Sequence, residues 1–363
     1  MKKILILAND SVYVYNLRRE LIERFISEGH KVFIASEGGE SVSDLENMGC
    51  VHYEIKVSRH GMNPADDLAL LGKYKKIIRE IGPEVVLTYN IKPNIYGAVA
   101  CKSLKVPCIA NITGLGTAVE NKSVVQSIIV LMYRYAFTDI KKVFFQNSEN
   151  MQFFADRKIA PGKYDLLPGS GVNLQRFVPL EYLSSEKTEF VFIARIMKEK
   201  GIDQYLEAAE YIRRKYPDTV FHVCGFCEQA YEEKLKELSD KGVIVYHGMV
   251  KDIKTILRDV HCTVHPTYYP EGMSNVLLES CASARPIITT DRSGCREIVD
   301  DGINGYVCRQ KDGADLIEKI ERFLALPFEE KRKMGENGRR KVEREFDREI
   351  VVKKYLEAIE RFE

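Results

Sequence analysis

Apolar residues along the chain form short continuous runs, and stretches with helical spacing of apolar positions lie between these runs. The chain begins with an apolar run at residues 4–8, a helical stretch at 17–27 and a second run at 31–35. This alternation predicts parallel strands connected by helices, because a strand buried on both faces is apolar throughout. It continues at residues 85–89, 94–104, 108–111 and 142–146. The first half of the chain therefore predicts one α/β domain.

A second series follows a turn-rich stretch at residues 161–179, which has several Gly and Pro residues and little periodicity. Strand-like and helical stretches then alternate at residues 190–194, 203–215, 220–224, 231–238, 243–246, 253–258, 263–265, 275–284 and 286–289. With a length of 363 residues, this organisation predicts two doubly wound domains, residues 1–165 and 166–343. We expect the domains to face each other across a cleft that holds the ligands.

Composition narrows the class of protein. The 54 basic and 53 acidic residues give a net charge of +1, which disfavours nucleic acid as a partner. The nine cysteines are scattered, and the first apolar run is too short for a signal peptide, so we expect reduced thiols in a cytoplasmic protein. The apolar stretch at residues 124–137 is too short to span a bilayer. The charged stretch at residues 328–363 predicts a pair of solvated helices.

Several cofactor motifs are missing from the sequence. Asn9 and its neighbours follow the first apolar run without the glycines that bind a dinucleotide, and neither a Walker A nor a His-Glu-x-x-His motif occurs. The single Cys-x-x-Cys motif, at Cys224 and Cys227, lacks a second pair and favours a turn over a redox or zinc site. We therefore expect chemistry without a metal ion or a bound cofactor.

Two cations follow the first strand-like run of the second half. Arg195 and Lys200 lie at the carboxyl end of the run at residues 190–194, where both side chains can reach one polyanion. A guanidinium fork with an ammonium point charge suits a diphosphate. The alternative is a pair of surface charges on a loop, and the two cations alone do not decide between these interpretations.

Two glutamates follow a later strand-like run. Glu271 lies in a loop that ends at Gly272, Ser274 fits a helix N-cap, and Glu279 falls in the first turns of the next helix. The backbone N–H groups at such a helix start bind anions, and a carboxylate on the helix can accept hydrogen bonds from a ribose diol. The spacing of the two glutamates alone is a weak signal for such a site. The strand before them and the two cations in the same half of the chain make the pattern specific.

The second half resembles the retaining glycosyltransferases of family 4, which have the two-domain GT-B fold. The resemblance rests on the two cations, on the two glutamates, and on residues 168–173 and 294–305. It implies that Arg195 and Lys200 hold the donor diphosphate, that Glu279 binds the ribose, and that Glu271 contacts the transferred sugar. It also implies backbone contacts from Met273, Ser274 and Asn275, a base site at residues 248–250 that includes Val250, no metal requirement, and a C-terminal helix at residues 344–363 that returns to the first domain.

The first half departs from the common family pattern. Thr113 stands where many relatives have a histidine that contacts the sugar, and His60 and His265 are more often structural or solvent-facing than replacements for it. The segment from Thr113 to Gly116, with residues 89–97, resembles a bacterial subgroup that extends saccharides on polyprenyl diphosphate. By this resemblance Asn9, Lys92, Thr113, Gly114 and Gly116 lie on the acceptor side. The two glycines let an acceptor approach the backbone, although a tight turn explains them as well.

An acceptor of that kind lies in a bilayer. Lys122, Arg134, Lys141 and Lys142 flank the apolar stretch at residues 124–137, which predicts contact with an anionic membrane surface. A helix that covers a parallel sheet would look equally apolar. The expected location is thus the cytoplasmic face of the membrane, with a peripheral protein.

The leading hypothesis is a retaining glycosyltransferase that moves a hexose or N-acetylhexosamine from a UDP-sugar to a lipid-linked saccharide in bacterial glycan assembly. A UDP-sugar epimerase with a similar two-domain layout is one alternative, although its acid and base groups are not found in the expected positions. A non-catalytic sugar-nucleotide-binding scaffold is another, and the intact set of Arg195, Lys200, Glu271 and Glu279 argues against it.

Overall fold

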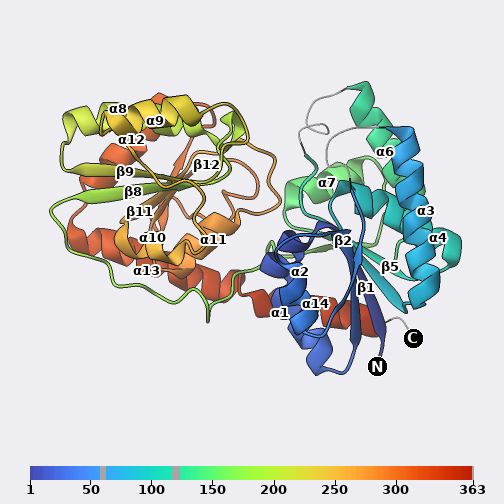
Figure 1. The fold of residues 1–363 in the computed structure, drawn as a ribbon. Coiled ribbons are helices and arrows are strands. Elements are labelled where there is room, and N and C mark those ends of the chain that lie inside the picture. Colours follow the sequence, from blue (N-terminus) through green and yellow to red (C-terminus); the bar gives the residue numbers. More distant parts are fainter. Residues whose placement is uncertain (58–62, 117–122, 362–363) are drawn as a thin grey trace. The chain divides into compact units, whose positions relative to one another are not determined.

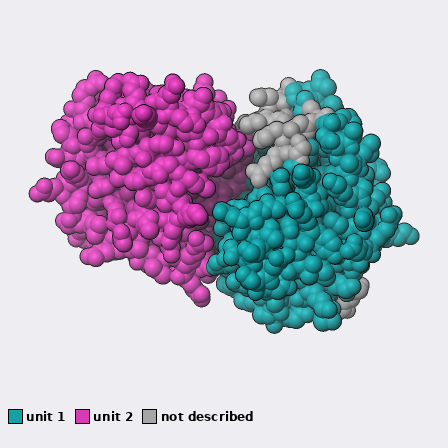
Figure 2. Space-filling view, viewed as in Figure 1, with its two compact units in different colours: residues 1–170, 348–363 teal, residues 171–347 magenta. Residues whose placement is uncertain are grey.

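The computed structural model describes residues 1–57, 63–116 and 123–361 (Figure 1). The chain divides into two compact units, which Figure 2 shows in teal and magenta. Unit 1 is Met1–Ser170 with Arg348–Glu363, and unit 2 is Gly171–Asp347. The sequence places the corresponding boundaries at residues 165 and 343.

Unit 1 is built on a parallel sheet of seven strands in the order β3-β2-β1-β4-β5-β6-β7. The strands are β1 (Lys3–Asp10), β2 (Lys31–Glu37), β3 (Val51–Glu54), β4 (Val85–Tyr89), β5 (Cys108–Ile112), β6 (Lys142–Phe145) and β7 (Tyr164–Leu166). The helices are α1 (Ser11–Ser27), α2 (Val42–Asn47), α3 (Pro64–Ile81), the π-helix η1 (Pro93–Gly97), α4 (Ala98–Leu104), α6 (Val124–Ala136), α7 (Ser148–Asp156) and α14 (Arg348–Glu360).

Both faces of this sheet are covered by helices. In β1 the side chains alternate, so that Leu5 and Leu7 join the core under α3, α4, α6 and α7, and Ile4 and Ile6 join the core under α1 and α14. Figure 1 shows these two helical layers on opposite sides of the strands. Burial on both faces is the physical reason for the unbroken apolar runs in the sequence.

Unit 2 repeats the plan with a parallel sheet of six strands in the order β10-β9-β8-β11-β12-β13. The strands are β8 (Thr188–Ile193), β9 (Thr219–Cys224), β10 (Val245–Tyr246), β11 (Cys262–His265), β12 (Ile287–Thr290) and β13 (Gly305–Cys308). The helices are the 3-10 helix η2 (Lys198–Lys200), α8 (Ile202–Lys215), α9 (Glu232–Asp240), α10 (Lys254–Asp259), α11 (Asn275–Ala282), α12 (Gly313–Leu324) and α13 (Phe328–Glu345).

The strand order of each sheet reverses at one point. In unit 1 this switch point lies between β1 and β4, and in unit 2 it lies between β8 and β11. Helices on the two sides of a switch point diverge, so the carboxyl ends of these strands form a natural place for ligands. The predicted α/β class with two doubly wound, Rossmann-like domains is confirmed.

The C-terminal segment corrects one prediction. The described residues from 328 onward form α13 and α14, as expected, but α14 is not a solvated helix. Its Val351, Val352 and Tyr355 are almost fully buried in the core of unit 1, beside residues of α1. The high charge of this stretch hides an apolar face, and α14 returns to the first domain as the resemblance implies.

Candidate active site

The switch point of unit 2 gathers the predicted donor-side residues. Arg195 follows β8, and Lys200 ends the short helix η2 in the same connection. Glu271 lies in the loop that leads from β11 to α11, and Glu279 lies on α11. Because β8 and β11 are adjacent and parallel, their following loops meet at one edge of the sheet.

Backbone contacts hold these two loops together. The Tyr268 N–H donates to the Glu199 carbonyl over 2.9 Å, next to Lys200. Gly201 then turns the chain with φ +81°, and a Cβ at this position would lie 2.1 Å from the Pro266 carbonyl oxygen. The close approach requires glycine here, and it fixes where the side chain of Lys200 begins.

Lys200 and Glu271 form an ion pair at this edge. Their side chains are only 10% and 16% exposed, and the Lys200 Nζ lies 4.7 Å from the centre of the Tyr269 ring. A buried ammonium and a buried carboxylate each require a partner, since an unpaired charge in the interior is strongly destabilising. The two predicted residues thus position each other before any substrate is present.

The electrostatics of Glu271 follow from these neighbours. Burial by itself would raise the pKa of Glu271, but the charge and hydrogen bond of Lys200, with smaller contributions from His265 and Arg195, hold the pKa below its usual range. Burial, together with the charge of Lys200, lowers the pKa of His265 to about 3. At neutral pH the site therefore contains a carboxylate beside a neutral imidazole.

Arg195 lies at the same edge of the sheet, and its side chain is half-exposed. Its guanidinium pairs with the carboxylate of Glu228 and lies 5.4 Å from the centre of the Tyr269 ring. Arg195 and Lys200 therefore share Tyr269 as a common neighbour, which brings the two cations to one place as the sequence predicts. A bound polyanion would meet both cations there.

The start of α11 is held by the segment that contains Gly294. The Ser274 N–H donates to the Gly294 carbonyl over 2.8 Å, and the Gly294 N–H donates to Glu297 Oε2 over 2.7 Å. A Cβ on Gly294 would lie 2.8 Å from the carbonyl oxygen of Gly272, so the two loops touch backbone to backbone. This contact places the segment at residues 294–305 beside the loop that carries Glu271.

The first turn of α11 presents backbone donors. Ser274 is the N-cap, as predicted, but its side chain makes no capping hydrogen bond. The N–H groups of Asn275 and its two successors have no acceptor within the helix, because they precede its first hydrogen bond. Met273 is buried in the core below, and Glu279 lies half-buried four residues after Asn275. This arrangement supplies an anion-binding helix start with a carboxylate one turn further on.

Val250 lies near the same edge. It is partly buried and packs against the apolar cluster that includes Val191 and Ile193 of β8. The preceding Gly248 accepts a hydrogen bond from the Gly225 N–H over 2.8 Å. The Cys224-Cys227 segment is thus a turn beside this site, and both cysteines are free thiols.

The predicted acceptor-side residues gather at the corresponding edge of unit 1. The Asn9 N–H donates to Asn90 Oδ1 over 3.2 Å, and so connects the ends of β1 and β4 at the switch point. Lys92 pairs with Asp67 over 2.8 Å, and the Tyr96 hydroxyl donates to the other oxygen of Asp67 over 2.8 Å. Burial, with help from Asp67, raises the pKa of Tyr96.

Thr113, Gly114 and Gly116 follow β5 at this edge. Gly114 and Gly116 have φ of +143° and +70°, so both need the conformational freedom of glycine. A Cβ on Gly116 would lie 3.4 Å from Ile91, which is ordinary contact. Thr113 is half-buried. His60 and Lys122 lie outside the described residues.

Sequence reasoning missed several residues of these sites. Tyr269, Glu228 and Asp67 contact the predicted cations but belong to no recognisable spacing. The position of Tyr269 two residues before Glu271 offers the only sequence signal among them. His265 was expected to be structural or solvent-facing, and it is buried next to the Lys200 and Glu271 pair.

Metal-binding clusters and membrane-spanning helices are both absent from the described parts of the chain. No group of three or more His, Cys, Asp or Glu residues there is placed to hold a metal ion, and metal independence stays a prediction. Over the same residues, every helix is too short or too polar to cross a membrane.

Family models match both halves of the chain. The model of glycosyl transferases group 1 matches residues 181–341, and that of the glycosyl transferase 4-like family matches residues 3–147. Together they cover most of the sequence and include every predicted site residue. The chain is a glycosyltransferase whose two halves match these two families.

Curated relatives of this glycosyltransferase include two named bacterial enzymes. N,N'-diacetylbacillosaminyl-diphospho-undecaprenol alpha-1,3-N-acetylgalactosaminyltransferase of Campylobacter jejuni is 24% identical, over 98% of this chain and 97% of its own. UDP-Gal:alpha-D-GlcNAc-diphosphoundecaprenol alpha-1,3-galactosyltransferase of Escherichia coli is also 24% identical, over 80% of this chain and 78% of its own.

Solved structures share the fold. A glycosyltransferase of Rickettsia africae superimposes with a TM-score of 0.83 at 20% identity, with 99% of this chain and 98% of its own covered. HepE of Anabaena, in complex with UDP and glucose, superimposes with a TM-score of 0.82 at 13% identity, with 99% and 100% covered.

Proposed function

We propose that this glycosyltransferase moves a hexose or N-acetylhexosamine from a UDP-sugar to a saccharide on polyprenyl diphosphate, with retention of the anomeric configuration and without a metal ion. The observation that carries the proposal is the buried pair of Lys200 and Glu271 beside Arg195 at the start of α11. This edge offers two cations and helix N–H groups for a diphosphate, and a carboxylate for a sugar hydroxyl.

The donor would lie with its diphosphate between the two cations and the first turn of α11. Glu279 would accept hydrogen bonds from the ribose diol, and the base would lie near Val250. The complex of HepE with UDP and glucose supports a uridine nucleotide in a protein of this fold. Because the cations and the helix start neutralise the leaving diphosphate, a metal ion has no necessary part.

The reaction would break the bond between the anomeric carbon and the diphosphate oxygen, and form a bond from that carbon to an acceptor hydroxyl oxygen. The acceptor proton would pass to the leaving diphosphate on the same face of the sugar. Glu271, held ionised by Lys200, would orient the sugar through its hydroxyls and would not form a covalent bond. In this front-face route retention needs no protein nucleophile.

The acceptor assignment draws on the relatives. The Campylobacter jejuni and Escherichia coli enzymes are both named for acceptors on undecaprenyl diphosphate, and the first matches almost the whole chain. Gly114 and Gly116 would allow close approach of such an acceptor, and Lys92 would lie beside it. Since this acceptor is anchored in a bilayer, the protein would work at the cytoplasmic face of the membrane in bacterial glycan assembly.

A thermal-shift screen tests the donor site first. Purified protein is heated with UDP, GDP, ADP and a panel of UDP-sugars without added metal, because a ligand of the native state raises its melting temperature. We expect a shift with UDP and with at least one UDP-N-acetylhexosamine, and loss of both shifts in Arg195→Ala. A shift with GDP alone, or an unchanged shift in the variant, would contradict the donor assignment.

A further inference from the structure

The exposed face of α6 is unusual for a helix that covers a sheet. Val124, Ile128, Leu131 and Tyr135 follow one another at spacings of four, three and four residues, so they share one face. They are 77%, 44%, 61% and 60% exposed. The opposite face of α6 is buried in the core of unit 1, and the helix contains no acidic residue. A row of exposed apolar side chains along one helix face usually marks a surface that binds a partner molecule or a membrane.

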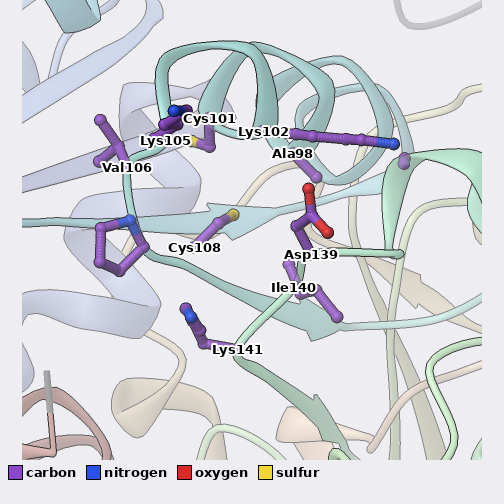
Figure 3. Close-up of a pocket in the computed structure, with 11 residues that line it drawn as sticks. Ala98, Cys101, Lys102, Lys105, Val106, Cys108, Asp139, Ile140 and Lys141 are labelled. Atoms are coloured by element: carbon purple, nitrogen blue, oxygen red, sulfur yellow. The ribbon is translucent and has the colours of Figure 1, made fainter.

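A basic cavity adjoins the C-terminal end of this helix. It has a volume of about 280 Å³ and opens where β5 and β6 begin, opposite the acceptor-side edge. Lys102, Lys105 and Lys141 line it, and Asp139 is the one acidic residue among its lining residues (Figure 3). Ala136 of α6 also lines it.

The three lysines are available for an anion. None of them forms an ion pair with another described residue, and Lys102 Nζ lies 4.3 Å from the centre of the Tyr135 ring. The apolar stripe and the basic cavity therefore meet at Tyr135 and form one continuous surface. We name it the α6 surface: the four exposed apolar residues of α6 with the three lysines.

We propose that the α6 surface docks on an anionic phospholipid leaflet, with the apolar stripe in the interface and lipid phosphate groups at the lysine cavity. This inference rests on the proposed function, because an acceptor on polyprenyl diphosphate requires the enzyme to reach the bilayer. The charges favour this occupant, since the cavity carries three cations against one acid. An exposed apolar stripe beside unpaired cations is the pattern of interfacial binding.

Among the described cations that the sequence singles out, Lys141 alone belongs to the α6 surface. Lys142 pairs with Asp165 over 3.0 Å, and Arg134 donates to the Arg157 carbonyl over 2.8 Å, so both already have partners. Lys102 lies on α4 and Lys105 directly follows that helix, 22 and 19 residues before the start of α6, and no pattern in the sequence connects them to it. The fold alone places them beside the stripe.

Sedimentation with vesicles tests the charges. Full-length protein is mixed with vesicles of phosphatidylcholine, with or without phosphatidylglycerol, at low and moderate salt. We expect binding only with phosphatidylglycerol, weaker at higher salt, and reduced on the order of 100-fold in K102Q/K105Q/K141Q, at about five-fold for each lysine. The control K236Q/K333Q/K353Q removes three exposed lysines elsewhere and should bind like the wild type. Equal binding by both triple variants would overturn the proposal.

The apolar stripe is tested separately. I128Q/L131Q should lower vesicle binding at least ten-fold, and the control V178Q/I303Q, at exposed apolar positions of unit 2, should not. All these residues lie on the surface, so melting temperatures should stay near the wild type. If light scattering instead shows a dimer that I128Q/L131Q dissociates, the surface is an interface between copies of this chain and the proposal is wrong.

Two further readouts separate this proposal from the proposed function. The UDP-induced thermal shift and the transfer to a short-chain, water-soluble acceptor diphosphate should be unchanged in K102Q/K105Q/K141Q, since its lysines lie away from the donor edge. Absence of transfer by the wild type would contradict the proposed function but leave the vesicle result standing.

Competition with inorganic phosphate distinguishes a lipid headgroup from free phosphate at the cavity. If inorganic phosphate displaces the protein from vesicles no better than chloride at equal ionic strength, the cations recognise the leaflet. Selective displacement by phosphate would assign the cavity to free phosphate and overturn the proposal.

Discussion

Lys200 donates to Glu271 across the two loops that follow adjacent parallel strands, and the pair is largely buried at the switch point of unit 2. The two residues are 71 positions apart in the sequence, and the reversal of strand order brings them together. Each charge is the partner that the other needs in a poorly solvated place. The pair links the diphosphate side of the proposed site to its sugar side.

Removal of the carboxylate charge should impair transfer more than donor binding. Glu271→Gln keeps the side-chain size but weakens one charged hydrogen bond to the sugar, so we expect transfer to fall about 10-fold to 100-fold. The UDP-induced thermal shift should persist, because Arg195 and the start of α11 are intact. Glu210→Gln, at an exposed position of α8, is the matched control. Unchanged transfer by Glu271→Gln would remove Glu271 from the mechanism.

The buried imidazole of His265 should make stability depend on pH. Its pKa is about 3 in the folded protein and about 6.5 in the unfolded chain, so between these values the unfolded state binds more protons. The free energy of unfolding should therefore decrease as the pH falls from 7, by about 2 kcal/mol at pH 5 from this group.

Urea unfolding of the wild type and His265→Asn at pH 7 and pH 5 measures this contribution. The variant cannot titrate at this position, so its loss of stability between the two pH values should be smaller by about 2 kcal/mol. Equal losses in the two proteins would show that His265 is protonated in the folded state or accessible to water.

A side chain at position 201 should lower the free energy of unfolding. Gly201→Ala puts a methyl group 2.1 Å from the Pro266 carbonyl oxygen and also strains a φ of +81°. Gly242→Ala strains a φ of +69° with no atom within 4 Å, so it isolates the backbone cost of about 1 kcal/mol. We expect Gly201→Ala to lose at least about 2 kcal/mol more than this control.

The same comparison has a functional readout. Displacement of the loop at Gly201 should also move Lys200, so the UDP-induced thermal shift should fall in Gly201→Ala and stay in Gly242→Ala. Similar unfolding energies for the two variants, measured in urea, would mean that the loops are not held as the structure describes.

The acceptor side should respond separately from the donor side. Lys92→Met removes the cation that pairs with Asp67, and we expect the KM for a lipid-linked acceptor to rise about ten-fold, as for the loss of one charged contact. The KM for the UDP-sugar should not change. The control Lys75→Met lies on α3, which also carries Asp67. A rise in the KM for the UDP-sugar alone would show that Lys92 acts on the donor and not on the acceptor.

The sequence was sufficient to predict the central strands of both sheets and the residues that gather at the switch point of unit 2. Burial on both faces makes each central strand a continuous apolar run, and the residues at the ends of β8 and β11 lie in short, recognisable segments. The edge strands β3, β7 and β13 were not predicted; β3 and β7 contain no buried residue, so they lack the continuous apolar run of the central strands. α12 and α3 were also missed as elements.

Contacts between distant segments could not be predicted from spacing. Asp67 reaches Lys92 from α3, and Glu228 reaches Arg195 from the connection after β9, so neither pair has a local signature. The burial of α14 was missed for a similar reason, since its apolar residues are diluted by charges along the chain. Only the packed structure shows that Tyr355 meets Asn111, with 2.7 Å between the hydroxyl and the amide nitrogen.

The central claim is transfer from a uridine-diphosphate sugar to a lipid-linked saccharide with retained configuration. The most direct measurement incubates the wild type with the UDP-sugar that shifts its melting temperature and a polyprenyl-diphosphate saccharide, in the presence of a metal chelator, and determines the product anomer by NMR. We expect a saccharide longer by one sugar, with the anomeric configuration of the donor, and none with Glu271→Ala. An inverted product, a requirement for metal, or an epimer of the donor formed without acceptor would contradict the account.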